Sequence, residues 1–393
     1  MISPGPSVMR LADFVNGNPY KPEDLTGTGH PVIRIRHLLD SDAEPDLAEP
    51  PARPVWIGDG DLIFSWSATL AVRIWDRGRA LLNQHLYRVD TRPGIHRGWF
   101  KYVLETGVEH LRPLMHGSTM THITQDMLRS MTVAVPPPAE QRAIADYLDA
   151  ETARIDALIA KKQQLIHLLD ERLQSMLFGA IGDWRTQPSR TLRQFGTRVL
   201  TGPFGTVLSA EEYIVSGVPL VNPTHIIDGR IVPEDGISVS QQVAERISRH
   251  RLAAGDLVMG RKGDVGRAAI VTADEAGWIC GSDSIAIRCG EDLLPEFLAW
   301  ALRVHLYRQQ LARTSTGAMV ANVNEGTLLG LRLPALRPDE QRSAVQRSTK
   351  VSLQRDQLRE RLLKHAGLLA EHRQALITGA VAGRAWPEIR HRT

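Results

Sequence analysis

One segment of the sequence occurs twice, and this internal repeat limits the fold more than any other feature. The motif Pro138-Ala139-Glu140-Gln141-Arg142 returns 200 residues later as Pro338-Asp339-Glu340-Gln341-Arg342. The register then holds without a gap as far as Gly179-Ala180 and Gly379-Ala380. An ungapped repeat of this length indicates one structural element that the chain uses twice.

Both copies have the pattern of a long helix. A proline is tolerated in a first helical turn, and the acidic residue after it suits the positive end of the helix dipole. Gly179 and Gly379 suit the left-handed residue that closes a helix. About forty residues lie between these marks, which corresponds to roughly 60 Å at 1.5 Å per residue. A helix of that length needs a partner helix.

The spacing of apolar residues predicts that the two helices pack on each other. In the first copy the steps are 4, 7, 3, 7, 4 and 7 residues, the a/d spacing of a coiled coil. These residues are Ile144, Leu148, Ile155, Leu158, Leu165, Leu169 and Met176. The second stripe keeps Leu358, Leu362, Leu369 and Leu376 but also contains Ser348, Arg355 and His365. We expect an antiparallel coiled coil with approximate internal two-fold symmetry, and the shared register argues against two unrelated solvated helices.

The segments before the two helices also resemble each other. Gly60-Asp61-Leu62-Ile63-Phe64 is answered by Gly255-Asp256-Leu257-Val258-Met259, and Pro31-Val32-Ile33 by Pro219-Leu220-Val221. Both patterns are typical of a turn followed by a strand. We therefore predict an α+β fold with two similar mixed α/β domains. The predicted ranges are 1–135 and 183–335 for the domains, 136–182 and 336–382 for the helices, and 383–393 for a C-terminal tail.

Composition is that of an ordinary soluble chain, with 42% hydrophobic and 23% charged residues. We find no apolar run near 18 residues and no signal peptide at the N-terminus, so we expect no membrane span. Cys280 and Cys289 cannot form a disulfide framework or build a zinc site by themselves. This cysteine usage fits the reducing cytoplasm.

Motifs that carry catalysis are missing. The sequence has no phosphate-binding G-x-x-x-x-G-K-[ST] loop, no G-x-G-x-x-G spacing and no H-E-x-x-H pair. Asn222-Pro223-Thr224-His225 is similar to the Asn-Pro-Pro-aromatic loop of adenine methyltransferases, but the second proline and the aromatic residue are absent. We therefore expect a binding protein without catalytic or metal-ligating residues. A stand-alone modification enzyme remains a competing hypothesis.

Local charge favours a nucleic-acid partner more than the net charge of +3 does. Seven Lys/Arg lie between Arg73 and Lys101, and six lie between Arg246 and Arg267. Glycines between Met259 and Arg267 would let the backbone approach a ligand closely. Asn83-Gln84-His85 is suited to an adenine or a phosphate, and hydroxyl-rich turns precede both long helices. Solvated surface, strand edges and helix caps would explain the same residues, and Trp66 suits a core.

The order of these elements resembles the specificity (S) subunit of type I restriction-modification enzymes over essentially the whole chain. The motifs that carry the resemblance are Val133–Gln141, Leu331–Gln341, Gly60–Ser65, Gly255–Met259 and Asn83–Leu86. Ala335 replaces a proline in the second copy. Ala68 and Ala71 stand where glycines are usual, so the geometry of the first recognition loop is less defined than that of Gly260–Gly266.

The resemblance implies a non-catalytic subunit with two target recognition domains. Each would read one half of a bipartite site in double-stranded DNA, and the helices would set the unread spacer and dock two methylation (M) subunits. The chain itself would bind no cofactor; the M subunits would bind S-adenosylmethionine, and the restriction (R) subunits would bind ATP and Mg. A coiled-coil adaptor that assembles other proteins without reading DNA is the main alternative.

The resemblance also directs the choice of DNA-binding residues. For the first half-site we predict Ser65, Ser67, Asn83, Gln84, Ser118, Thr119 and His122. For the second half-site we predict Arg261, Lys262, Arg267, Ser315, Thr316 and Asn322.

Overall fold

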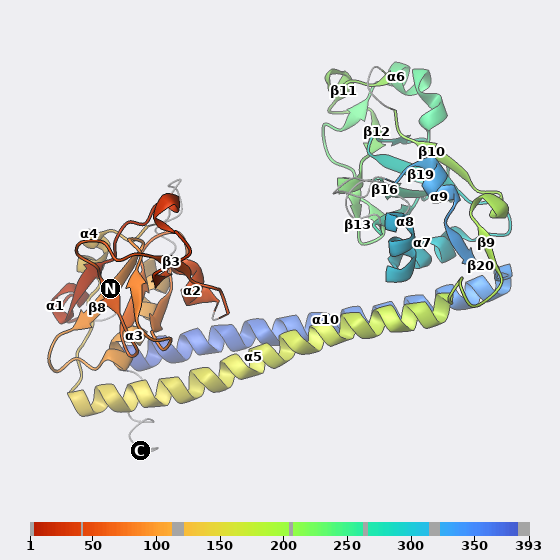
Figure 1. Ribbon diagram of the computed structural model, residues 1–393. Helices are drawn as coiled ribbons and strands as arrows, with labels where there is room; N and C mark the ends of the chain where they lie inside the picture. Colours follow the sequence, from red (N-terminus) through yellow and green to blue (C-terminus); the bar gives the residue numbers. More distant parts are fainter. Residues whose placement is uncertain are drawn as a thin grey trace. The chain divides into compact units, whose positions relative to one another are not determined.

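The chain forms two compact units in a computed structural model that describes residues 4–40, 42–111, 122–203, 207–261, 266–313 and 323–383. Unit 1 comprises Met1–Gln163 with Leu363–Thr393, and unit 2 comprises Gln164–Leu362. Each unit contains one globular part and a portion of both long helices (Figure 1). None of the helices in the described ranges is long and apolar enough to span a bilayer.

Unit 1 has two four-stranded sheets. The central sheet is antiparallel, with the order β1 (Ala12–Asn16), β8 (Leu86–Thr91), β5 (Leu62–Ser65) and β6 (Val72–Ile74). The second sheet has the order β3 (Asp46–Ala48), β2 (His30–Ile33), β7 (Ala80–Leu82) and β4 (Trp56–Ile57), and β2 and β7 are parallel. The globular part also contains the helices α1 (Val8–Leu11), α2 (Ile35–Leu39), α3 (Arg97–Leu111) and α4 (Gln125–Ser130).

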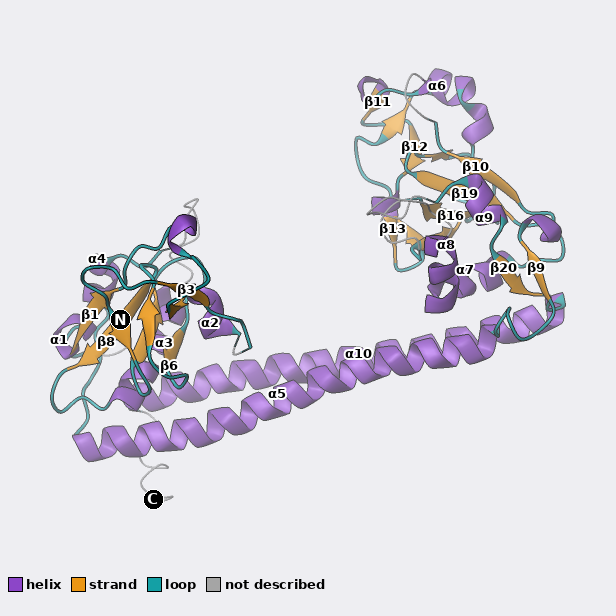
Figure 2. Ribbon diagram, in the orientation of Figure 1, coloured by secondary structure: helices purple, strands orange, loops and turns teal. Residues whose placement is uncertain are grey.

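The central sheet of unit 2 repeats the strand order of unit 1, whereas the second sheet keeps a parallel pair but places it at the edge. Figure 2 shows the helices and strands of both units. In unit 2 the central sheet has the order β10 (Arg198–Thr201), β19 (Ser284–Arg288), β16 (Leu257–Gly260) and β17 (Ala268–Ile270). The second sheet contains β11 (Tyr213–Ile214), β15 (Ser238–Val239), β12 (Val218–Val221) and β18 (Ile279–Cys280), and here β12 and β18 are parallel. The prediction of two similar mixed α/β domains is therefore confirmed.

Unit 2 also contains shorter elements. These are the hairpin β13 (Ile226–Ile227) and β14 (Arg230–Ile231), the pair β9 (Ser189–Thr191) and β20 (Arg332–Pro334), and the helices α6 (Gln241–Arg246), α7 (Pro295–Arg303), α8 (His305–Arg313) and α9 (Glu325–Leu329).

The shared Gly-Asp motif forms a turn directly before one inner strand of the central sheet in each unit, β5 in unit 1 and β16 in unit 2. Gly60 and Gly255 have φ of +87° and +84°, a conformation that favours glycine. The carboxylate of Asp61 accepts a hydrogen bond from the Gly58 amide at 2.8 Å, and Asp256 accepts one from Ala253 at 2.8 Å. The apolar residues that follow are fully buried, so this motif conserves backbone geometry in both units.

The two long helices are α5 (Pro138–Ile181) and α10 (Pro338–Val381), each of 44 residues. Both helices begin at the repeated motif, and the glutamine of that motif fixes the start of each helix through its hydrogen bonds. Oε1 of Gln141 accepts from the His96 amide at 2.6 Å, and Nε2 donates to the carbonyls of Gly94 and Pro136. The repeated glutamine thus ties the first turn of α5 to the loop before α3.

Gln341 makes the same three contacts in unit 2. Its Oε1 accepts from the Leu294 amide at 2.8 Å, and its Nε2 donates to the carbonyls of Asp292 and Leu336. Both glutamines are almost completely buried, at 1% and 0% exposure. A glutamine is required because one side chain must accept one hydrogen bond and donate two.

Contacts within each unit confirm the antiparallel pairing. In unit 2, Arg355 forms an ion pair with Asp170 at 3.5 Å, whereas Arg347 contacts the carbonyl of Ala180. The α10 residue number therefore falls as the α5 number rises. In unit 1, Ile144 and Leu148 from the start of α5 share a core with Ile377, Ala380 and Val381 from the end of α10.

The predicted seam of α5 is only partly correct. Ile144, Leu148 and Ile155 are buried, whereas Leu158, Leu165 and Met176 are 43%, 49% and 42% exposed. The buried stripe instead includes Thr152 and the half-buried Ile159, Lys162, Ile166 and Leu169. This stripe advances by alternating steps of 4 and 3 residues. The polar side chains of Thr152 and Lys162 concealed it in the apolar pattern.

The stripe predicted for α10 needs the same correction. Leu358 is 44% exposed and His365 is also exposed, whereas Ser348 is buried and Arg355, Leu362, Leu369 and Leu376 are half-buried. The leucines outside the stripe leave apolar surface on both long helices.

Candidate nucleic-acid interface

The two units share a backbone arrangement beside the central sheet, which we call the frame. In unit 1, the Trp66 amide donates to the carbonyl of His85 at 3.3 Å, and the Ile123 amide donates to the carbonyl of Trp66 at 2.8 Å. In unit 2, the Arg261 amide donates to the carbonyl of Asp283 at 3.0 Å, and the Val323 amide donates to the carbonyl of Arg261 at 2.8 Å. The frame joins the segment after β5 or β16, the segment before β8 or β19, and the segment before α4 or α9.

The frame of unit 1 carries an aromatic cluster. The Trp66 ring lies 5.9 Å from the His85 ring and 6.0 Å from the His122 ring, and its Nε1 donates to the carbonyl of Gln84 at 3.0 Å. Oγ of Ser67 lies 3.0 Å from Nδ1 of His85, and Ser67 forms an isolated bridge with His122. The structure thus brings Ser67, Gln84 and His122 together.

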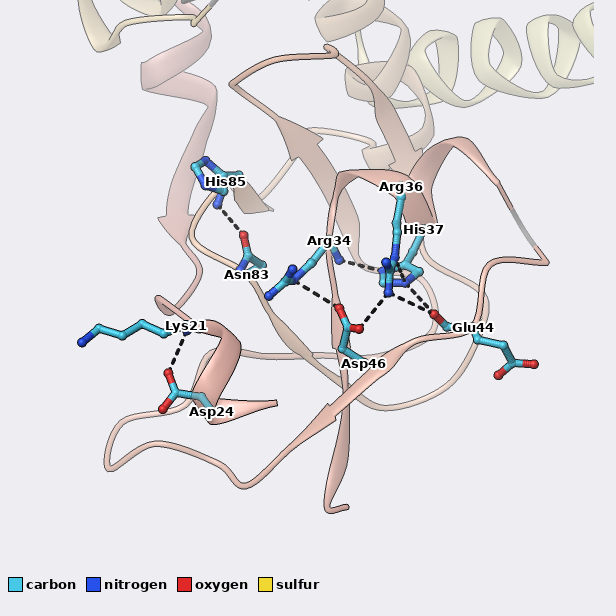
Figure 3. Close-up of polar contacts among 9 residues, drawn as sticks. All are labelled: Lys21, Asp24, Arg34, Arg36, His37, Glu44, Asp46, Asn83 and His85. Carbon is cyan, nitrogen blue, oxygen red and sulfur yellow. Dashed lines mark hydrogen bonds and ion pairs between the residues drawn. The ribbon is translucent and has the colours of Figure 1, made fainter. Parts of the chain in front are cut away.

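Two further predicted residues of unit 1 have side chains that are used inside the protein. Ser65 is fully buried, and its Oγ donates to the carbonyl of Thr69 at 2.6 Å. Asn83 is 4% exposed, and its Oδ1 accepts from the His85 amide at 3.2 Å (Figure 3). In this structure these two side chains position the loop, and their role as DNA contacts stays a prediction.

The frame of unit 2 carries charged residues at the equivalent positions. Arg261 takes the place of Trp66, Asp283 takes the place of His85, and Arg267 is exposed just before β17. The remaining predicted residues lie outside the described ranges; they are Ser118, Thr119, Lys262, Ser315, Thr316 and Asn322.

The basic run of unit 1 does not provide a free cationic surface. Each of its seven side chains contacts another residue of the same unit: Arg73 with Leu38, Arg77 with His37, Arg79 with Trp56, Arg88 with Asp90, Arg92 with Asp13, Arg97 with Asp61, and Lys101 with Asp149. In contrast, the Arg267 side chain has no hydrogen bond or ion pair with any residue that the structure describes. In the basic run of unit 2, Arg246, Arg249 and Arg251 also contact residues of their own unit, so the difference between the runs concerns Arg267.

Polar contacts of the second sheet in unit 1 are also structural (Figure 3). Nδ1 of the fully buried His37 accepts from the Arg34 amide at 2.9 Å, and Nε2 lies 3.1 Å from the carbonyl of Glu44. Nε2 also accepts from Nε of Arg36 at 3.0 Å, and burial lowers the pKa of His37, which favours the neutral ring. Nearby, Asp46 binds Arg36 at 2.8 Å and Arg34 at 3.3 Å.

The methyltransferase-like stretch of unit 2 has an equivalent structural role. Asn222 precedes a single 3-10 turn, Pro223–His225, and Nδ1 of the buried His225 lies 3.3 Å from the Asn222 amide. The ring therefore caps the turn and does not line an open site. This geometry agrees with the prediction that the stretch is not a methyltransferase loop.

No metal site is formed by the residues that the structure describes. Among them, no three His, Cys, Asp or Glu side chains gather in a way that could hold a metal ion. Cys280 and Cys289 are free thiols, and burial raises the pKa of each to about 12. Both thiols are therefore protonated near neutral pH and are poor nucleophiles.

Comparison with known proteins identifies the family. Residues 56–168 match the family model for the type I restriction modification DNA specificity domain. The EcoBI specificity subunit of Escherichia coli is 22% identical over 293 residues, which are 68% of this chain and 62% of that protein. By these matches the chain is similar to the type I restriction enzyme specificity subunits. The alignment thus spans less than two thirds of the EcoBI subunit.

Two further matches cover more of this chain. The MjaVIII specificity subunit of Methanocaldococcus jannaschii is 19% identical over 86% of this chain and 84% of its own length. A chain from a solved structure concerned with complex assembly and conformational transition of the type I R-M system has a TM-score of 0.72. It is 15% identical and covers 98% of this chain and 99% of that chain, so it supports the fold.

Sequence reasoning missed a group of arginines in unit 2. Arg303, Arg308, Arg355 and Arg359 line one cleft together with the predicted Arg267. They come from α7, α8 and α10, so no local motif links them. The only sequence signal was an arginine in the apolar stripe of α10, at Arg355.

Proposed function

We propose that this S subunit reads a bipartite target in double-stranded DNA, with one unit for each half-site. The observation that carries the proposal is the repeated frame with different side chains. Because the backbone arrangement is the same while Trp66 and His85 are replaced by Arg261 and Asp283, the two units would contact different bases. Stacking and apolar contacts suit the first frame, and charged hydrogen bonds suit the second.

We also propose that catalysis resides on partner subunits. Both long helices carry exposed apolar side chains, at 42–58% exposure, which would suit helices of another protein. They are Leu158, Leu165, Leu168 and Met176 on α5, and Leu353, Leu358, Leu363 and Leu368 on α10. Two M subunits that bind S-adenosylmethionine and methylate adenine would dock there, and R subunits that use ATP and Mg would join them in the cytoplasm.

Methylome sequencing of cells that carry the system tests this function. We expect methylated adenine within one motif of two defined blocks separated by an unread spacer of constant length. A single continuous block would contradict the assignment of one half-site to each unit. Methylation without sequence preference would instead support the coiled-coil adaptor.

An assay with the purified full chain separates recognition from catalysis. With labelled S-adenosylmethionine and target DNA, the chain alone should transfer no methyl group, whereas the chain assembled with M subunits should transfer it. Transfer by the chain alone would overturn the non-catalytic assignment.

A further inference from the structure

Unit 2 contains a cationic cleft that neither the frame nor the apolar helix surface explains. Its volume is about 600 Å³, and it lies among β17, α7, α8 and the parts of α5 and α10 that belong to this unit. Five arginines line it against two aspartates, Asp228 and Asp356. The arginines are Arg267, Arg303, Arg308, Arg355 and Arg359.

Three of these arginines have guanidinium donors that the protein leaves unused. Arg267, Arg303 and Arg359 form no side-chain hydrogen bond or ion pair with residues in the described ranges. The guanidinium of Arg303 lies 4.7 Å from the centre of the Trp300 ring, and burial lowers its pKa. A partly buried guanidinium without an acceptor is unfavourable, so an anion in the cleft would be stabilised.

Two glycines make room for the arginines. A Cβ atom at Gly229, where φ is +79°, would lie 2.7 Å from Nη2 of Arg303. A Cβ atom at Gly266 would lie 2.6 Å from Cδ of Arg308. Side chains at these positions would crowd the guanidinium groups, so the local backbone suits a lining of arginines.

The ligand must offer several acceptor oxygens. Arginine presents a planar fork of donors that matches phosphate and carboxylate groups. Arg267 and Gly266 belong to the segment between β16 and β17 that begins at Arg261 of the frame, so the cleft adjoins the candidate interface along the chain. This continuity favours the ligand that the frame is proposed to bind.

We propose that the cleft binds phosphates of the DNA backbone next to the half-site contacted by unit 2. This inference rests on the proposed function and adds a contact that is independent of base sequence. Phosphate contacts fix the register of a protein on the duplex, whereas base contacts specify the sequence. The cleft would therefore contribute affinity and salt dependence and leave the recognised sequence unchanged.

The test uses the full chain assembled with M subunits and measures DNA binding across a range of salt concentrations. The variant is Arg267→Gln with Arg359→Gln, since both side chains are exposed and neither supports the fold. Each phosphate contact multiplies the binding constant by the molar salt concentration raised to roughly the power −0.9. Losing two contacts should therefore lower affinity roughly thirtyfold at 0.15 M salt. The loss should be equal for target and random duplexes.

A matched control is Arg342→Gln, which removes one charge from an exposed position of α10 outside the cleft. It should leave affinity and salt slope unchanged, and it shows how much the net charge alone matters. The single variants Arg267→Gln and Arg359→Gln should each lower the salt slope by about one.

Each other outcome has a distinct meaning. An unchanged salt slope in the double variant, with the wild-type complex still bound to its target, would overturn the cleft proposal and leave the proposed function intact. Absence of target binding by the wild-type complex would instead refute the proposed function. Loss of the M subunits from the variant, with an unchanged slope, would assign the cleft to an acidic protein segment and overturn the phosphate site.

Discussion

The two units use one backbone plan, but they place opposite charges at one position. His96 and Leu294 donate to equivalent glutamines, and nine residues after each of them stand Glu105 in unit 1 and Arg303 in unit 2. Both side chains project from the helix that covers the central sheet. The glutamine contacts fix equivalent positions for the two residues, so their surroundings can be compared directly.

In unit 1 this position belongs to an ion-pair network. The carboxylate of Glu105 lies 3.7 Å from Arg373 of α10, and Arg373 lies 3.0 Å from Asp156 of α5. The 200-residue offset of the repeat makes Asp356 the counterpart of Asp156 and Leu173 the counterpart of Arg373. In unit 2 an apolar residue therefore occupies the position of the arginine in this network. Arg303 therefore lacks the partner that its counterpart has, and arginines gather around an open cleft.

The difference shows how a repeated module can acquire a second role. The elements that hold the module on its helices are retained, while one helix position changes sign and frees a set of cations.

The largest effect is expected from the shared glutamines. Gln141→Ala and Gln341→Ala each remove three hydrogen bonds and leave buried backbone groups unsatisfied, so each should lower the free energy of unfolding by about 3 kcal/mol. Hydrogen exchange should accelerate at α3 in the first variant and at α7 in the second. The exposed neighbours Arg142→Ala and Arg342→Ala serve as controls and should change little. A large loss of stability in only one of the two variants would show that the two glutamines do not have equivalent roles.

The second prediction concerns the frames. Arg261→Ala with Lys262→Ala should weaken binding to the target duplex by about 1–3 kcal/mol and relax base preference in one half-site only. His85→Ala should relax preference in the other half-site, since His85 is an exposed member of the cluster around Trp66. Methylome sequencing of both variants measures these changes. Altered preference in both blocks after one substitution would contradict the division between units.

Much of the fold could be predicted because the repeat preserves local chemistry. The proline and glutamine positions mark helix starts, and their roles depend on neighbours in the chain or on one fixed loop. The prediction that Gly179 and Gly379 close the helices is wrong, because both lie inside helices and the left-handed glycines are Gly182 and Gly383. The seam was harder, because Thr152 and Lys162 occupy coiled-coil positions while Leu158 and Leu165 are exposed. Apolar periodicity fails where a helix carries leucines that stay exposed.

Candidate-site residues were predicted less well for a related reason. Ser65 and Asn83 have the side chains expected at a binding loop, but these side chains form hydrogen bonds with the backbone of the loop itself. The basic run of unit 1 is likewise spent on internal acids, carbonyls and rings. Conversely, Arg303 and Arg359 are separated by 56 residues and meet only through tertiary structure. Residue type alone does not show whether a donor is already satisfied.

The third prediction tests the closed network of unit 1. Arg373→Ala should lower the free energy of unfolding by about 2 kcal/mol, because it leaves the largely buried carboxylate of Glu105 without its partner. The value lies between those of exposed and buried pairs, since the Arg373 side chain is 27% exposed. Adding Glu105→Gln should recover part of this loss in chemical denaturation. No recovery would show that Arg373 acts through packing of its stem.

The same network predicts a pH dependence. Burial raises the pKa of Glu105 above its usual 4.5, although Lys101 and Arg373 oppose the shift. A raised pKa in the folded state means that folding takes up a proton between the two values, so stability contributed at this site rises as pH falls through that window. Removing Arg373 raises the pKa further. The deficit of Arg373→Ala should therefore shrink as pH falls from 8 towards 5, and a deficit that grew would reverse the assignment.

The smallest effect on stability is expected at Arg303, the counterpart of Glu105. Arg303→Gln should change the free energy of unfolding by less than about 0.5 kcal/mol, because no described residue forms an ion pair or side-chain hydrogen bond with it and burying the cation is itself costly. Thermal unfolding of Arg303→Gln beside Arg373→Ala measures the contrast directly. If both arginines proved equally important for folding, the cleft would be a structural element like the network of unit 1. If Arg303→Gln left the free energy of unfolding unchanged and lowered the salt dependence of DNA binding, Arg303 would act in binding DNA and not in folding.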